Sequence, residues 1–164
     1  MYQLIVGMGS CGLSAGAKET YQKLEQLLLK HKGIASLSIT GCFGMCYCEP
    51  LIEVRNGKNR TFYGFVNPEM AEEIFTSHIL NNKILEKFTV LEISDDNLVK
   101  GIEKDYYIEQ LRIVLRNCGT INPEKIEEYE SACGYAALKK AISMNPPNKI
   151  GRAHVWTPVT ASYL

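Results

Sequence analysis

Two glycine-rich loops that carry cysteine constrain this chain more than any other feature. The first, Gly-Met-Gly-Ser-Cys-Gly at residues 7–12, follows a short apolar segment at 2–6. The second, Gly-Cys-Phe-Gly-Met-Cys at 41–46, follows another β-prone segment at 34–40. Between them, residues 14–32 have apolar side chains at the three- and four-residue spacing of an amphipathic helix. A helical crossover makes consecutive strands parallel, so both loops are predicted to leave the same edge of one sheet.

The segments after the second loop predict a hairpin and a second helix. Asn56-Gly57 lies between the β-rich runs 51–55 and 60–65, which is a strong hairpin signal. Asn67 followed by Pro68 is typical of a capped helix start, and this helix is predicted to run to about Leu80. The order is β-α-β-β-β-α, an α/β fold in which helices cover a mixed four-stranded sheet. That order is the thioredoxin-like arrangement.

The remaining chain divides into three stretches. We assign residues 1–82 to the α/β domain and 83–109 to a linker or arm that contains a strand-like run at 88–93. Residues 110–147 form a short helical segment, with helices predicted at 123–130, capped by Asn122, and at 132–144. Residues 148–164 resemble a translated sequencing adapter with a stop codon decoded as Trp156. We treat this tail as non-native, and the chain as truncated.

Composition excludes several functions. Eighteen basic residues balance eighteen acidic ones, so no net charge recruits nucleic acid. The apolar runs are shorter than the about 20 residues that a bilayer span needs. Ala15-Gly16-Ala17 imitates a signal-peptide cleavage site, but no basic region precedes it. We therefore expect a reducing, cytoplasmic location, where cysteines serve more often as metal ligands or redox thiols than as disulfides.

The first loop also matches G-x-G-x-x-G between a strand and a helix, a pattern of dinucleotide-binding folds. However, the second predicted strand ends Ile39-Thr40-Gly41-Cys42, without the acidic residue that such folds use. The hairpin that follows also interrupts the βαβ repeat. The glycines are better explained as backbone that bends around Cys11 and offers amide hydrogens to sulfur.

Cys11, Cys42, Cys46 and Cys48 are the candidate metal ligands. Four thiolates from facing loops suit a [2Fe–2S] cluster, and tetrahedral zinc would also accept them. Cys48 is the doubtful fourth ligand, because Cys46-x-Cys48 is cramped. A non-cysteine ligand, a missing cluster and buried inert thiols are the alternatives. Thiol–disulfide catalysis is disfavoured because the chain has no C-x-x-C.

Two further cysteines, Cys118 and Cys133, lie in the segment 110–147. We predict that they pack against neighbouring side chains and have no ligand role.

These motifs carry a resemblance to a known family. Residues 2–80, through the two cysteine loops and Glu49-Pro50-Leu51, resemble the thioredoxin-like [2Fe–2S] ferredoxin domain that begins the NADH-binding flavoprotein subunits of NAD(P)-linked hydrogenases and complex-I-like NADH dehydrogenases. Residues 110–143, with Leu-Arg-Asn-Cys-Gly at 115–119 and Gly-Tyr-Ala-Ala-Leu at 134–138, resemble the lead-in to the flavin-binding core of the same subunit.

The resemblance implies an electron-transfer module that passes single electrons through a [2Fe–2S] cluster. Its partners would be the sister subunits of an NADH-linked oxidoreductase, without nucleic acid and without direct membrane insertion. Sites for FMN, NAD and a [4Fe–4S] cluster are expected only in a missing downstream part, so the fragment itself should not oxidise NADH. The alternative is a docking domain without a cluster that serves assembly with partner subunits.

Overall fold

The computed structural model describes residues 1–94, 97–101, 111 and 113–144. It divides into two compact units, Met1–Glu124 and Lys125–Leu164. The tail assigned to 148–164 lies outside the described residues. Among the helices that the structure describes, none has the length and apolar character needed to cross a bilayer.

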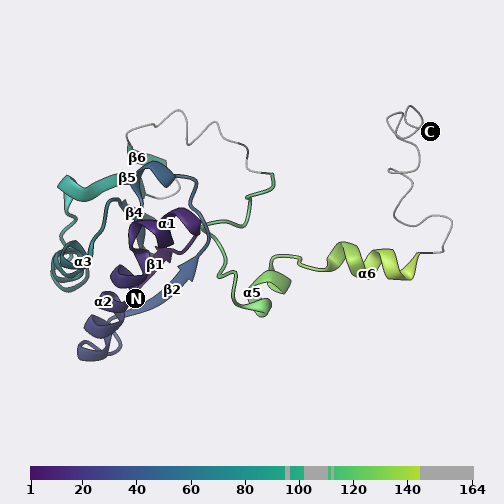
Figure 1. The fold of residues 1–164 in the computed structure, drawn as a ribbon, viewed down its shortest axis with the longest axis horizontal. Coiled ribbons are helices and arrows are strands. Elements are labelled where there is room, and N and C mark those ends of the chain that lie inside the picture. The colour runs from purple at the N-terminus through teal and green to yellow at the C-terminus, as the bar shows by residue number, and fades with distance from the viewer. Residues whose placement is uncertain (95–96, 102–110, 112, 145–164) are drawn as a thin grey trace. The chain divides into compact units, whose positions relative to one another are not determined.

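The first unit is built on one mixed sheet with the strand order β2-β1-β3-β4-β5-β6 (Figure 1). β1 and β2 are parallel, as predicted, and every other neighbouring pair is antiparallel. The strands are β1 (Tyr2–Gly7), β2 (Ala35–Thr40), β3 (Ile52–Asn56), β4 (Asn59–Tyr63), β5 (Thr89–Ser94) and β6 (Asn97–Gly101).

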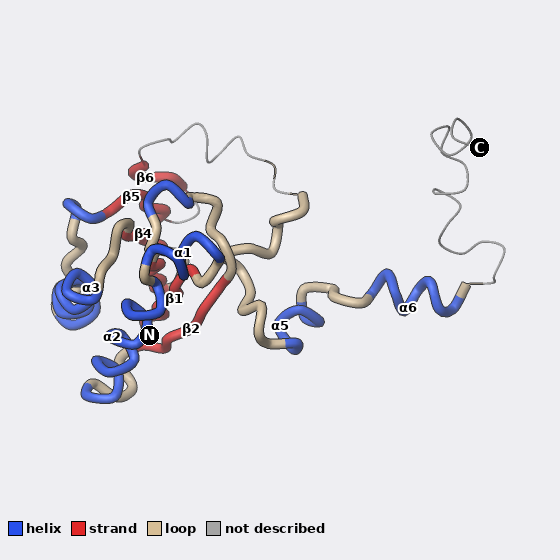
Figure 2. Tube along the Cα trace, viewed as in Figure 1, coloured by secondary structure: helices blue, strands red, loops and turns tan. Residues whose placement is uncertain are grey.

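The α/β thioredoxin-like fold is confirmed, but the sheet has six strands rather than the predicted four. The additional strands β5 and β6 come from residues 83–109, which we had assigned to a linker or arm. β5 pairs with β4, where Phe62 lies opposite Leu91, and β6 then pairs with β5. Their hydrogen bonds satisfy the backbone edge that β4 would otherwise expose. In Figure 2, β5 lies next to β4, and β6 lies beyond β5.

The first predicted helix is two helices. α1 (Ser10–Ala15) and α2 (Ala17–Lys30) meet at Gly16, whose φ of 100° lies in the left-handed region that favours glycine. α1 begins earlier than predicted, so that Cys11 lies in its first turn. A short 3-10 turn, η1 (Cys46–Cys48), follows the second cysteine loop.

The second helix begins as predicted. The Asn67 side chain accepts a hydrogen bond of 2.8 Å from the Met70 amide, and Pro68 opens α3 (Pro68–Ile74). A π-helical stretch, η2 (Phe75–Leu80), continues it to the predicted end. A 3-10 turn, η3 (Glu86–Phe88), then leads into β5.

Alternation along the strands divides the buried side chains between the two faces of the sheet. On one face, Leu4 and Val6 of β1 pack with α2 and α3 in the larger core cluster. On the other face, Ile5 packs with β4, β5 and the second cysteine loop. This smaller cluster consists of Ile5, Phe43, Met45, Cys48, Leu51, Phe62, Val90 and Leu91. The loop that holds Cys42 and Cys46 is therefore anchored by its own apolar residues.

The described part of the second unit contains α5 (Ile126–Ser131) and α6 (Ala136–Ser143). α5 begins at Ile126, later than the predicted start at 123. The rings of Tyr129 and Tyr135 meet edge to face at 5.1 Å between the two helices.

Candidate functional site

The parallel pairing of β1 and β2 brings the two cysteine loops together. Gly7 lies opposite Thr40 at the last position of the register, and the Met8 amide extends the pairing by donating to the Thr40 carbonyl at 2.9 Å. Past the strands, the loops touch: a Cβ added to Gly9 would lie 3.2 Å from the Cys42 Cβ. A larger residue at Gly9 would therefore push the loops apart.

Three of the four predicted ligands meet at this contact. The Cys42 and Cys46 sulfur atoms lie 3.3 Å apart, and the Gly44 amide donates to the Cys42 sulfur at 3.2 Å. The pKa of the Cys46 thiol is raised to about 12, first by its hydrogen bond with Cys42, then by burial and by a hydrogen bond with Cys11. Cys11 from the first loop and both cysteines of the second loop thus form one thiol cluster, which we call the three-thiol cluster.

Alternation along the second loop explains how this cluster is presented. Phe43 and Met45 are 2% and 6% exposed and point into the smaller core cluster. The Cys46 side chain is exposed, and the Cys42 side chain is partly exposed. Burial of the two apolar side chains stabilises the loop by roughly 1.5–3 kcal/mol each, and it leaves the flanking Cys42 and Cys46 at or near the surface.

Cys48, the doubtful fourth ligand, does not join the three-thiol cluster. Its side chain is 0% exposed and lies in the smaller core cluster, and its thiol donates to the Met45 carbonyl at 3.3 Å. Burial, with Glu49 adding to it, raises the pKa of this thiol to about 11. The physical reason is the η1 turn, which rotates Cys48 inward two residues after Cys46.

The chemistry of the three-thiol cluster fits iron in a sulfur-bridged cluster. Thiolates are the ligands that such clusters use, and backbone amide donors such as Gly44 stabilise charge on sulfur. Among the described residues, no three His, Cys, Asp or Glu side chains surround a position suited to a single metal ion. In their present contact the sulfur atoms of Cys42 and Cys46 share one hydrogen bond of 3.3 Å. Holding iron requires that they lose their protons and separate.

Two further groups near the loops were not anticipated from the sequence. Thr40, at the end of β2, accepts a hydrogen bond of 3.0 Å from the Gly119 amide and donates one of 3.0 Å to the Ile121 carbonyl.

Glu49 is 8% exposed, and one of its carboxylate oxygens, Oε2, accepts from the Leu51 amide at 2.8 Å. The other oxygen, Oε1, is buried with no partner among the described residues. Burial raises the pKa of the Glu49 carboxyl.

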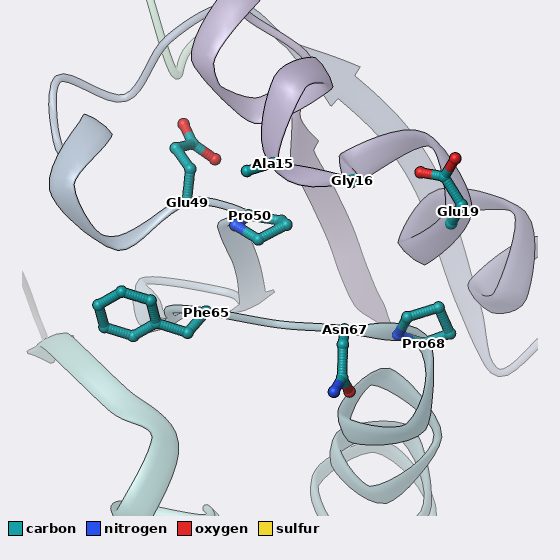
Figure 3. A pocket seen from close by; sticks show the side chains of 8 residues that line it. All are labelled: Ala15, Gly16, Glu19, Glu49, Pro50, Phe65, Asn67 and Pro68. Carbon is teal, nitrogen blue, oxygen red and sulfur yellow. The ribbon is translucent and has the colours of Figure 1, made fainter.

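A pocket of about 440 Å³ lies beside Glu49 (Figure 3). Phe65, at its margin, is 61% exposed and has a left-handed φ of 56°. Strained backbone of this kind is concentrated at functional positions. The lining residues are Ala15, Gly16, Glu19, Glu49, Pro50, Phe65, Asn67 and Pro68.

Solved structures of a thioredoxin-like [2Fe–2S] ferredoxin from Aquifex aeolicus are similar to this chain. The wild-type structure at 1.5 Å resolution matches with a TM-score of 0.51 and 19% identity, over 55% of this chain and 96% of that chain. A second structure matches with a TM-score of 0.53 and 17% identity, over 60% of this chain and 98% of that chain. At these identities the likeness establishes the fold, and it confirms the thioredoxin-like resemblance seen in the sequence.

A curated relative matches a shorter stretch more closely. The NADP-reducing hydrogenase subunit HndC of Solidesulfovibrio fructosivorans is 50% identical over 38 residues, which are 23% of this chain and 8% of that protein. This chain therefore matches a small part of the relative's length. No protein-family profile matches the chain.

Proposed function

We propose that the first unit is an electron-transfer module that holds a [2Fe–2S] cluster through Cys11, Cys42 and Cys46. The observation that carries the proposal is the convergence of these three thiols from two loops that lie 31 residues apart in the sequence, counted from Cys11 to Cys42. Such a cluster supplies a one-electron redox step.

The chain's own residues would hold and tune this group. Parallel strands β1 and β2 fix the spacing of the two loops, and Phe43 and Met45 anchor the second loop in the core. The Gly44 amide already donates to the Cys42 sulfur, and hydrogen bonds to ligand sulfur set the reduction potential of iron–sulfur sites. Partial exposure of Cys42 and exposure of Cys11 and Cys46 leave the site open to a redox partner.

We further propose that this module belongs to an NADH- or NADPH-linked flavoprotein subunit of a cytoplasmic hydrogenase or dehydrogenase complex. The match to HndC supports this context. Residues 110–147 would begin the flavin- and NADH-binding region of that subunit, which would carry the FMN, NAD and [4Fe–4S] sites. Sister subunits of that complex would then be the electron partners.

Anaerobic reconstitution of the full chain with ferrous iron and sulfide tests the cluster. We expect the visible absorption of a [2Fe–2S] centre, with iron and sulfide in equal amounts, and its loss in Cys42→Ser and Cys46→Ser. A colourless protein that retains no iron after desalting would contradict the proposal.

The same measurement distinguishes the electron-transfer module from a second candidate function, a docking domain without a [2Fe–2S] cluster. Exposed Phe65 with its left-handed backbone favours this candidate, because an exposed aromatic residue is a frequent anchor in protein interfaces. An iron-free chain that still binds a sister subunit, and loses that binding in Phe65→Ala, would support docking.

A further inference from the structure

A turn from the far end of the first unit lies against the second cysteine loop. Its Gly119 amide and Ile121 carbonyl both bind the Thr40 hydroxyl, each at 3.0 Å. Thr40 is 1% exposed, so its hydroxyl depends on these partners rather than on water. Because Thr40 lies two residues before Cys42, the turn is fixed at the base of the three-thiol cluster. We call this pair of hydrogen bonds the Thr40 clamp.

A second contact holds the same turn from another side. A Cβ added to Gly119 would approach the Phe43 ring to 3.0 Å, and Gly119 has a left-handed φ of 78°. Only glycine combines this conformation with so close an approach without strain. Phe43 directly follows Cys42, so the turn is fitted to the residues on both sides of that cysteine.

These two contacts place Cys118 beside the cluster. A Cβ added to Gly41 would lie 3.8 Å from the Cys118 sulfur, which puts that sulfur over the backbone immediately before Cys42. The side chain is partly exposed. From the sequence we predict that Cys118 only packs, as a residue of the segment that resembles the lead-in to a flavin-binding core.

We propose that Cys118 supplies the fourth thiolate ligand, completing the set formed by Cys11, Cys42 and Cys46. This inference rests on the proposed function. Iron–sulfur clusters of this type take four thiolates, and the first two loops present three. Cys48 is held in the core by its bond to the Met45 carbonyl, whereas Cys118 stands at the surface beside the cluster.

The fourth ligand would come from the segment that resembles the lead-in to a flavin-binding region. The [2Fe–2S] cluster would then link the loops after β1 and β2 to the turn at 115–121 through iron–sulfur bonds. A complete cluster would therefore form only when that turn is docked.

The test compares Cys118→Ser with the matched control Cys133→Ser in the full chain. Cys133 is also a free cysteine, but it is exposed in the second unit. Both variants are reconstituted anaerobically with ferrous iron and sulfide. Iron content, visible absorption and electron paramagnetic resonance of the dithionite-reduced protein are measured. A parallel titration with Co²⁺ counts thiolates through sulfur-to-cobalt charge-transfer absorption, independently of cluster assembly.

We expect Cys118→Ser to shift or abolish the visible and paramagnetic signals and to lower the cobalt charge-transfer intensity by about one quarter, the share of one thiolate in four. Cys133→Ser should match the wild type in every readout. Circular dichroism establishes that both variants are folded.

Two other outcomes have distinct meanings. A wild type that takes up iron, with Cys118→Ser indistinguishable from it, would overturn the fourth-ligand assignment and leave the proposed function standing. A wild type that binds neither iron nor Co²⁺ would overturn both.

Discussion

The hydroxyl of Tyr63 lies 2.7 Å from Nδ1 of His78. The Leu85 amide also donates to this oxygen, at 3.4 Å. Burial lowers the pKa of His78 to about 4 and raises the pKa of Tyr63 to about 12. This pair ties η2 to β4 in the interior of the first unit.

Stability should fall as the pH drops from about 6.5 towards about 4. In this window an unfolded His78 binds a proton while the folded one does not. The loss should approach about 1.4 kcal/mol per pH unit. Urea unfolding at a series of pH values should show that the free energy of unfolding depends less steeply on pH in His78→Gln than in the wild type. His31→Gln, at a partly exposed histidine beside Phe75, is the control. Equal slopes in wild type and His78→Gln would contradict the assignment.

Glu53 carries a buried ion-pair network on β3. It is 0% exposed and accepts from Arg55 Nε at 2.8 Å and from Arg60 Nε at 2.6 Å. Glu53→Ala should destabilise the protein by about 3 kcal/mol, because it removes the buried carboxylate that both partly buried guanidinium groups bind. Glu73→Ala, which breaks the exposed pair with Lys87, should cost less than about 1 kcal/mol. Chemical denaturation measures both, and similar losses would argue against a special role for Glu53.

Gly12 packs where α1 crosses the end of β1. A Cβ at Gly12 would come within 3.2 Å of Glu49 Oε2 and still closer to the Gly7 carbonyl. Gly12→Ala should therefore cost about 1–3 kcal/mol and separate the two loops. Gly41→Ala is the control, because its Cβ would meet nothing nearer than the Cys118 sulfur at 3.8 Å. Thermal unfolding followed by circular dichroism should give Gly12→Ala a clearly lower melting temperature than Gly41→Ala. The reverse order would refute this packing.

Cys48 should be dispensable for metal uptake. Its thiol is buried and bonded to the Met45 carbonyl, so Cys48→Ala should keep the iron content of the wild type. The expected cost is about 1 kcal/mol of stability from the lost hydrogen bond and contacts. Cys46→Ala should show the opposite pattern, with iron lost and stability little changed. Iron analysis after reconstitution, with urea unfolding of each variant, checks both halves. Loss of iron in Cys48→Ala would return Cys48 to the ligand set.

Local signals in the sequence were sufficient for much of the fold. The Asn-Gly turn and the Asn67 cap each depend on neighbouring residues, and the parallel pairing of β1 with β2 follows from the helical crossover between them. All three are confirmed. The strands β5 and β6 were missed as part of the sheet, although the strand-like character of 88–93 was visible. Their place is decided by pairing with β4, about 30 residues earlier in the chain.

The ligand set was predictable only in part, for a similar reason. Cys11, Cys42 and Cys46 follow from strand order and spacing. The inward turn of Cys48 depends on the three-residue η1 turn, which spacing alone does not reveal. The docking of Gly119 on Thr40 joins residues 79 apart, and no periodic pattern in the chain marks it.

The Thr40 clamp also determines which residues must be transferred if the module is placed in another protein. A shortened form that ends after β6 would retain the whole sheet, yet it would leave a buried hydroxyl at Thr40 and the Phe43 ring without their covering turn. The portable module therefore extends to Glu124, where the first unit ends. Grafting the ferredoxin-like fold onto a new host would require this return segment as well as the sheet.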